Sequence, residues 1–379
     1  MSEIVFRNAR MVLADSVEDG DLIVAGETIR EIADPGTGAG GIDLEGDWLL
    51  PGLVELHTDH LEGHFAPRPG VRWNPAVAVQ AHDAQVATSG ITTVLDALRV
   101  GADEDARVQV QEMRGLADAI EESQDKGRLR AEHFVHLRCE VSASDVMDGF
   151  ALFENDPRVK LVSLMDHTPG QRQFASFDAY RIYYQGKTGM DDETFQRFVD
   201  RRMAEGGRWS PKHRKLISDL CRERGIRLAS HDDATEAHVA EAIEFGVHVA
   251  EFPTTVAAAR ASKEAGMQVL MGAPNIVRGG SHSGNVAAAE LAAENLLDVL
   301  SSDYVPFSLI QAVFAISEVV EGVDLPQAVA MVSANPAKAV GLDDRGVIAP
   351  GKRADFVQVR FDDGVPVVRS VWRQGRRVA

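Results

Sequence analysis

One short stretch of the sequence gathers residue types that bind metal ions. Residues 53–64 read LVELHTDHLEGH, with three histidines and one aspartate within eight positions after an apolar run. The apolar run predicts a buried strand, on which successive side chains point to opposite faces. His57 and Asp59 are therefore expected to share one side, and Thr58 and His60 the other if the strand continues. Imidazole and carboxylate together suit zinc, and also manganese or iron.

Other β-type runs also end in polar residues that could join such a site. HLRCE ends in Glu140, LVSLMDH in Asp166 and His167, LASHDD in His231, Asp232 and Asp233, and VLSSD in Asp303. The expected metal ligands are His57, Asp59, Glu140, His167, His231 and Asp303. Glu140 has an alternative role, a salt bridge to a nearby arginine, and the remaining aspartates could orient the histidines instead. By the same two-residue period, His136 and Arg138 face the side of Glu140, and Cys139 does not.

Most of the remaining histidines are expected to be bystanders. A single histidine in a folded protein is more often a hydrogen-bonded polar residue than a ligand. We expect this ordinary role for His60, His64, His133, His213, His238 and His248.

The middle of the chain alternates between strand-type and helix-type segments. Eight β-type runs recur: GLVELHTD, GITTVLDAL, EHFVHLRCEV, KLVSLMDH, IRLASHDD, VHVAEFPTT, MQVLMGAPN and LLDVLSSD. Helical patterns lie between several of them, as in EDARVQVQEMRGLADAIEESQ, TEAHVAEAIEFG and TVAAARASKEAG. This alternation predicts an α/β fold, a parallel (β/α)8 barrel with its active site at the carboxyl ends of the strands. An open doubly wound sheet is the alternative. The long connection 168–226 is expected to carry a helix and to contribute to substrate binding.

Both ends of the chain are rich in short strands. IVFRNARMVL, DLIVAG and TIREIAD precede the barrel segment, and ADFVQVRF and GVPVVRSVWRQGRRV follow it. Each group is too small to bury a core alone. We therefore expect one small β-sandwich domain from residues 1–50 and 341–379, beside a hydrolase barrel over 51–340.

Composition excludes several classes of function. The 379 residues carry a formal net charge of −19, which disfavours binding to nucleic acid or anionic membranes. No stretch of about 18 apolar residues predicts a membrane span, and the start does not read as a signal peptide. With two cysteines and no CxxC motif, a reducing cytoplasm is the expected location. The sequence leaves open whether several copies assemble.

The motifs resemble one family along essentially the whole chain. HTD after PGLVEL, single ligands on later strands and a final SSD resemble the amidohydrolase superfamily, whose members share a metal-centred barrel and a small terminal β-sandwich. The longer motifs are similar to the α-D-ribose 1-methylphosphonate 5-triphosphate diphosphatase family of phosphonate utilisation. They include WLLPGLVELHTDHLEGHFAPRPGVRW, SGITTVLDA, LVSLMDHTPGQRQF, YYQGK and LMGAPNIVRGGSHSGN.

The resemblance implies a role for each candidate ligand. His57 and Asp59 would bind a first divalent metal, His167 and His231 a second, and Glu140 would bridge them. Asp303 would bind metal and accept the proton of the attacking water. Two features depart from the common superfamily pattern: Asp59 replaces a histidine, and the second pair falls on the fourth and fifth strands rather than the fifth and sixth. Zinc is the first expectation for the metal, with manganese or iron as alternatives and one or two ions bound.

The resemblance also implies a small anionic phosphorylated sugar as substrate. Water would attack the 5-triphosphate, breaking the bond between the α- and β-phosphates and releasing pyrophosphate. The glycine-rich loop 275–285 is expected to bind phosphate, because glycines let backbone N–H groups approach and arginine can clamp a phosphate. A turn that needs glycine only for its geometry is the alternative. His282 could protonate the leaving group or only hydrogen-bond to it. The expected substrate contacts are Arg278, Ser281, His282, Asn285, Arg172 and Lys187.

Two other functions are compatible with parts of this pattern. A conventional amidohydrolase acting on a cyclic amide, an N-acetyl sugar or an aminated base would share the metal centre. It should have a pocket for a neutral ring rather than an anion-binding loop. A non-enzymatic relative should have lost ligands, whereas every expected position here holds a ligand-capable residue.

Overall fold

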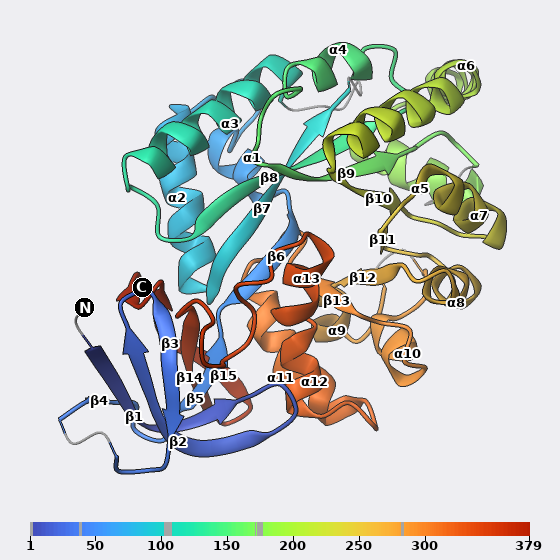
Figure 1. The fold of residues 1–379 in the computed structure, drawn as a ribbon. Coiled ribbons are helices and arrows are strands. Elements are labelled where there is room, and N and C mark those ends of the chain that lie inside the picture. Colours follow the sequence, from blue (N-terminus) through green and yellow to red (C-terminus); the bar gives the residue numbers. More distant parts are fainter. Residues whose placement is uncertain (1–2, 38–39, 102–107, 171, 173–176, 282–283) are drawn as a thin grey trace.

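The computed structural model describes residues 3–37, 40–101, 108–170, 172, 177–281 and 284–379. Its centre is an eight-stranded parallel sheet in which each strand pairs with the next along the chain (Figure 1). The strands are β6 (Leu53–Thr58), β7 (Ile91–Val100), β8 (Glu132–Glu140), β9 (Val159–Met165), β10 (Arg227–His231), β11 (Val249–Glu251), β12 (Gln268–Gly272) and β13 (Val299–Ser301). Each of the eight predicted runs forms one of these strands, which confirms the α/β barrel.

The sheet closes where its first and last strands meet. Thr58 and Asp303 form a parallel bridge, and the Asp303 N–H donates to the His57 carbonyl at 3.1 Å. Glu55 reinforces this seam, because its two carboxylate oxygens accept the backbone N–H groups of His57 and Ser302, each at 2.6 Å. The seam therefore fixes two candidate ligands from opposite ends of the barrel segment beside each other.

The barrel interior has an apolar floor with polar side chains one step above it. Leu161, Ala229 and Val249 are buried in one cluster. Two residues further along the same three strands are Ser163, His231 and Glu251. Because side chains on a strand repeat with a period of two, each polar residue stands directly above an apolar one at the carboxyl end. The barrel is thus filled below and polar above.

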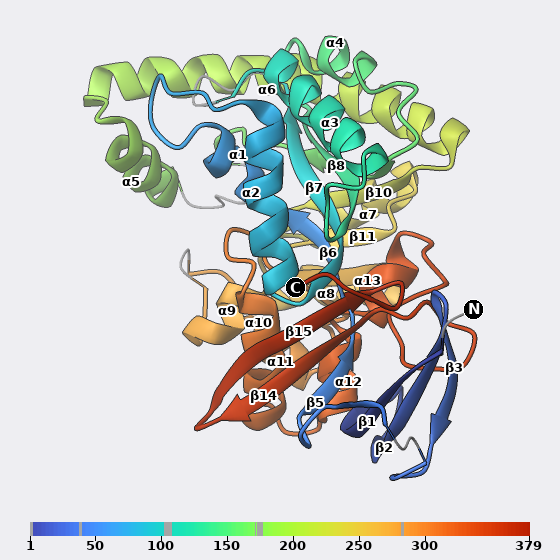
Figure 2. The ribbon, with the colours of Figure 1, turned by 90° about the vertical axis from the view of Figure 1, so that its left-hand side faces the viewer.

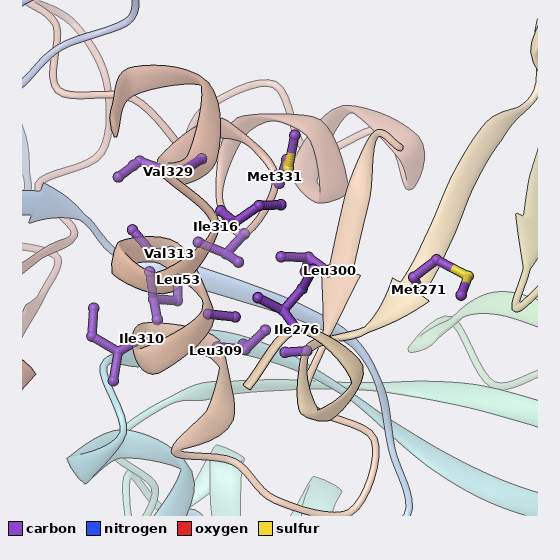
Figure 3. Close-up of a cluster of buried hydrophobic side chains, with 14 of the residues drawn as sticks. Leu53, Met271, Ile276, Leu300, Leu309, Ile310, Val313, Ile316, Val329 and Met331 are labelled. Atoms are coloured by element: carbon purple, nitrogen blue, oxygen red, sulfur yellow. The ribbon is translucent and has the colours of Figure 1, made fainter. Parts of the chain in front are cut away.

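Helices cover the outside of the sheet. Those after the first strands are α1 (His60–Phe65), α2 (Pro75–Thr88), α3 (Val110–Asp125) and α4 (Val146–Ala151). Those of the second half are α7 (Glu236–Phe245), α8 (Val256–Glu264), α9 (Ala273–Arg278), α10 (Ala288–Ala293), α11 (Ser308–Val319), α12 (Leu325–Ala330) and α13 (Ala334–Ala339). Figure 3 shows one part of the outer core, in which Ile310 and Val313 of α11 pack near Leu53 and Leu300 of the barrel. The predicted helical patterns EDARVQVQEMRGLADAIEESQ, TEAHVAEAIEFG and TVAAARASKEAG are confirmed by α3, α7 and α8, while residues 104–107 of the first lie outside the described residues.

The long connection after β9 holds two helices, α5 (Phe177–Thr188) and α6 (Asp192–Arg224). Tyr180 and Tyr184 of α5 pack against Phe195 and Phe198 of α6 in a separate small core. In Figure 2, α5 and the first half of α6 extend beyond the barrel. Although α6 has 33 residues, it is rich in charge, and none of the described helices combines the length and apolarity that a membrane crossing requires.

Strands from both ends of the chain form the second sheet, as expected. Its order is β16-β15-β14-β5-β1-β2-β3, with β4 beside β1. The strands are β1 (Glu3–Val12), β2 (Val17–Ala25), β3 (Thr28–Ala33), β4 (Ile42–Asp43), β5 (Trp48–Pro51), β14 (Phe356–Asp362), β15 (Val365–Arg373) and β16 (Arg376–Arg377). The ring centroids of Phe6 on β1 and Trp372 on β15 lie 5.1 Å apart, although two strands separate β1 from β15 in the sheet order. The sheet therefore folds over its own core. We retain 1–50 with 341–379, and 51–340, as the proposed domain division.

Candidate metal centre

All six predicted ligands lie at the carboxyl end of the barrel strands. Three of them belong to the last two residues of a strand: His57 of β6, Glu140 of β8 and His231 of β10. The other three follow a strand end within two residues: Asp59 after β6, His167 after β9 and Asp303 after β13. Among the described residues no further strand enters this sheet. His167 and His231 therefore belong to the fourth and fifth strands, as counted from the sequence.

A buried carboxylate joins two of these ligands. The Nδ1 of His57 donates to Glu251 Oε1 at 3.1 Å, and the Nδ1 of His231 donates to Glu251 Oε2 at 3.2 Å. Glu251 is fully buried, and His57 and His231 are 1% and 5% exposed. Burial favours the neutral acid, but the surrounding imidazoles of His136 and His57 outweigh it and hold the pKa of Glu251 well below its usual range. A carboxylate on Nδ1 leaves Nε2 of each ring for a metal, which is the usual arrangement around metal-binding histidines.

Glu251 is a residue of this candidate site that the sequence analysis did not predict. It is the last residue of β11, a strand of only three residues within VHVAEFPTT, and its partners lie 20 and 194 positions away. One signal was present: a glutamate ending an apolar run, at the same strand end as the predicted ligands. Its register partner is His231.

His136 completes this inner layer. Its Nδ1 donates to the Leu56 carbonyl at 2.9 Å, and its Nε2 lies 2.5 Å from Ser163 Oγ, which also contacts Glu251. Burial lowers the pKa of His136 to about 3, so the ring is neutral at pH 7. The predicted shared face of His136, Arg138 and Glu140 is confirmed, because all three contact residues of the barrel mouth while Cys139 packs in the outer core.

A second group of ligands lies around His167. Its Nδ1 donates to Glu140 Oε2 at 2.5 Å, and its ring is 6.0 Å from that of His231. One atom each of His167, His231 and Asp232 lies within 4.8 Å of the others, a spacing that could hold a metal ion. Burial would raise the pKa of Glu140, but His167, Arg202 and Arg99 together lower it, so Glu140 is a carboxylate.

Asp59 and Asp303 form the third side of the site. Asp59 Oδ2 accepts from Arg138 Nη1 at 3.2 Å. Asp303 interacts electrostatically with the charges of Asp59 and Arg138. Burial, together with the charge of Asp59, raises the pKa of Asp303. Asp303 also has a φ of +56°, and Asp232 one of +57°. Non-glycine residues in this left-handed region are strained, and such strain gathers at functional sites.

These residues fit a divalent metal. Their donors are imidazole nitrogens and carboxylate oxygens, the set that zinc, manganese and iron accept. One observation supports a cation at this position. Asp232 Oδ2 is buried without a hydrogen-bond partner among the described residues, and it lies 3.5 Å from His231 Nε2. A buried carboxylate oxygen without a donor is costly, and a metal ion at this position would satisfy it.

The predicted anion loop lies after β12. Asn275 Oδ1 accepts from the Ala288 N–H at 3.0 Å, and Ser281 Oγ accepts from the Asn285 N–H at 3.2 Å. Arg278 ends α9, and its side chain is exposed. His282 lies outside the described residues. The loop is thus held in place by its own polar side chains, with an arginine left at the surface.

The two candidates on the long connection differ in setting. Arg172 is only 4% exposed and forms ion pairs with Asp233 and with Glu241, the latter at 2.5 Å. In the structure its guanidinium is therefore already held in buried ion pairs, which tie the long connection to the end of β10 and to α7. Lys187 is on α5, but its side chain lies outside the part that the structure describes.

Asp166 and Asp233, the aspartates that could have oriented the histidines, have other partners among the described residues. Asp166 accepts from Thr168 and Ser210, which ties the middle of α6 to the end of β9, and Asp233 pairs with Arg172. Of the expected bystanders, His133 and His213 are hydrogen-bonded, His133 to two aspartates and His213 to the Val141 carbonyl at 3.0 Å.

Comparison with known proteins now places the chain. A model of the amidohydrolase family matches residues 190–379. The α-D-ribose 1-methylphosphonate 5-triphosphate diphosphatase of Escherichia coli K12 is 50% identical over 377 residues, covering 99% of this chain and 100% of that protein. This chain belongs to that diphosphatase family of amidohydrolases. Two solved structures share the fold of the family. N-acetylglucosamine-6-phosphate deacetylase from Mycobacterium smegmatis is 15% identical, with full coverage of both chains and a TM-score of 0.65. N-isopropylammelide isopropylaminohydrolase from Burkholderia multivorans is 17% identical, with coverage of 100% of this chain and 98% of that chain and a TM-score of 0.65.

Proposed function

We propose that this protein hydrolyses α-D-ribose 1-methylphosphonate 5-triphosphate to α-D-ribose 1-methylphosphonate 5-phosphate and pyrophosphate. The observation that carries the proposal is 50% identity, over the full length of both chains, to a diphosphatase of that name. The candidate ligands and a glycine-rich loop stand at the same end of the barrel, which is where barrel enzymes do their chemistry. The reaction would serve phosphonate breakdown, and two buried free cysteines suit a reducing cytoplasm.

One or two divalent ions, with zinc as the first expectation, would be held by His57, Asp59, His167, His231 and Asp303. Glu140 would lie between the pair His57 and Asp59 and the pair His167 and His231. When bound, such ions lower the pKa of a water molecule and stabilise charge on phosphoryl oxygens. Glu251 holds His57 and His231 with their Nε2 atoms free for this purpose.

Asp303 would accept the proton of the attacking water. A general base works best when its pKa lies near the working pH. Burial and the charge of Asp59 raise the pKa of Asp303 in that direction. Its left-handed backbone, held across the barrel seam by hydrogen bonds to His57 and Asp59, fixes the carboxylate at the mouth.

The triphosphate would be bound from the loop after β12. Arg278 is exposed at the end of α9 and can pair with phosphate oxygens, while Ser281 and Asn285 offer polar groups a few residues on. His282 would hydrogen-bond to the leaving pyrophosphate or protonate it. Arg172 and Lys187 remain proposed contacts from the long connection. For Arg172 this contact requires sharing its guanidinium with Asp233 and Glu241.

Phosphorus NMR tests the proposal. Metal-loaded protein is incubated with the triphosphate beside a chelator-treated sample and beside an Asp303→Asn variant. Metal-dependent pyrophosphate in the wild type alone is the expected result. Release of single phosphate would move the cut to the outer bond. No release from verified metal-loaded protein would reject the diphosphatase and direct attention to amide and deamination substrates.

A further inference from the structure

A group of imidazoles outside the barrel has no role in the proposed reaction. His60 and His64 lie one helical turn apart on α1, where side chains four residues apart share one face. Their rings are 5.0 Å apart. The ring of His82 on α2 is 6.2 Å from His60 and 6.0 Å from His64. Three imidazoles from two neighbouring helices thus gather at one place.

The Nε2 atoms of His60 and His64 converge on one atom. Each contacts Gln85 Oε1, at 2.9 Å and 3.2 Å respectively. Gln85 follows His82 by three residues on α2, so both project toward α1. His60, His64 and Gln85 are half-buried, which leaves solvent access to the group.

His82 is prepared as a ligand in the way that metal-binding histidines usually are. It is fully buried, and its Nε2 lies 2.7 Å from Asp96 Oδ1, while its Nδ1 has no hydrogen-bond partner among the described residues. A proton on Nε2 toward the carboxylate leaves Nδ1 with a bare lone pair. A carboxylate behind an imidazole fixes the tautomer and raises the basicity of the other nitrogen.

Asp96 is itself fixed. Its second oxygen lies 2.7 Å from His133 Nδ1, and the other nitrogen of His133 lies 3.3 Å from Asp83. Asp83 also accepts the N–H groups of Arg130 and Ala131 at 2.8 Å and 2.9 Å. One atom each of His82, Asp96 and His133 comes within 4.8 Å of the others. These atoms are already hydrogen-bonded to one another. Asp96 and His133 therefore hold His82 in place and are not themselves expected to bind a metal ion.

We propose that His60, His64 and His82 form an auxiliary site for one divalent transition-metal ion, zinc first, with Gln85 as a neighbouring oxygen donor. A tetrahedral ion with Zn–N bonds of about 2.0–2.1 Å would place imidazole centres about 5 Å apart. The His60–His64 separation already matches this value. The two separations from His82 must close by about 1 Å, which the half-exposed side chains on α1 can supply.

The ion would tie α1 to α2. Helix α1 has only six residues and begins directly after Asp59, which is its N-cap and makes no side-chain capping hydrogen bond. Such a helix is short of local stabilisation. The auxiliary ion would therefore steady the turn that carries a ligand of the barrel centre, while lying outside that centre.

Equilibrium dialysis against micromolar zinc, followed by elemental analysis, tests the site. The comparison is between the wild type, the double variant His60→Gln/His64→Gln, and the single variant His248→Gln as a control for loss of an exposed histidine elsewhere. We expect the wild type and the control to hold one more zinc ion per chain than the double variant. We also expect zinc affinity at the extra site to fall by at least about 100-fold in the double variant. Glutamine at half-exposed positions should leave the fold intact, which far-ultraviolet circular dichroism checks.

Cobalt gives a second, independent measurement. Cobalt(II) in a tetrahedral nitrogen-rich site absorbs in the visible, and one such spectral component should be lost in the double variant and kept in the control. Equal zinc counts in the wild type and the double variant would overturn the proposal. So would an equal loss of zinc in the His248 control. Neither outcome depends on phosphate hydrolysis, so failure here is distinct from failure of the proposed reaction.

Discussion

Replacing Glu251 by glutamine should weaken metal binding at the barrel centre without any change in size. The carboxylate accepts the Nδ1–H of His57 on one oxygen and the Nδ1–H of His231 on the other. Glutamine offers one oxygen and one NH2 group, so one of the two imidazoles must face a donor. That ring is driven to carry its proton on Nε2, the nitrogen that the metal needs.

The size of the effect follows from that single misplaced proton. Loss of an outer partner of a metal-binding histidine typically costs about 10–100-fold in affinity, which corresponds to about 1.4–2.8 kcal/mol. Because Glu251 is fully buried among the imidazoles of His57, His136 and His231, water cannot replace the lost acceptor easily, and we expect the upper part of the range.

The assay is a chelator competition for zinc on purified protein, with turnover followed across the same metal concentrations. Activity should be recovered in Glu251→Gln when excess metal is added. Glu132→Gln is the matched control, since Glu132 is a partly buried glutamate paired with Arg345 and Arg353 away from the mouth. That control should lose stability but keep its zinc affinity. Wild-type zinc affinity in Glu251→Gln would refute the reasoning.

Three further predictions concern separate parts of the molecule. Asp303→Asn should lower kcat by at least about 100-fold, since a general base contributes about 10²–10⁴-fold; unchanged turnover would remove its proposed role. Arg278→Ala should raise KM for the triphosphate about tenfold or more, with Arg278→Lys in between because lysine keeps the charge but not the fork; steady-state kinetics decide, and an unchanged KM in both would exclude the contact. His133, held between Asp96 and Asp83 against the opposing effect of burial, has its pKa raised to about 9 from 6.5. Its stabilising contribution is therefore complete below pH 6.5 and is lost as the pH rises through 9, so urea unfolding should show a fall on the order of 3 kcal/mol over that window in the wild type and little change in His133→Gln.

The fold was accessible from the sequence because its signals are local. Each barrel strand is a short apolar run with a polar end, and the period of two then assigns His57, His136 and Glu140 to the interior. These assignments need only neighbours along the chain, and the structure confirms them. The sandwich also followed, because neither terminal group of strands can bury a core alone.

The parts that escaped prediction depend on partners far apart in the chain. Glu251 contacts two ligands only because β6 and β10 bring His57 and His231 to its two oxygens, and the glutamate that ends the apolar run does not by itself identify these partners. The charge of Arg172 beside a conspicuous motif predicts a substrate contact, yet its guanidinium is buried against Asp233 and Glu241. Charge indicates what a side chain can bind, whereas burial decides what it has already bound.

The stretch HTDHLEGH shows how backbone geometry divides one run of ligands between two places. The strand ends at Thr58, so His57 points into the barrel and meets Glu251, while a helix begins at His60 and turns His60 and His64 toward α2. In both places a buried carboxylate on a strand holds one nitrogen of an imidazole: Glu251 behind His57, and Asp96 behind His82. The nitrogen that remains is Nε2 in the barrel and Nδ1 outside it. The spacing of histidines alone does not distinguish these sites. The carboxylate behind each ring does, because it determines which lone pair a metal would find.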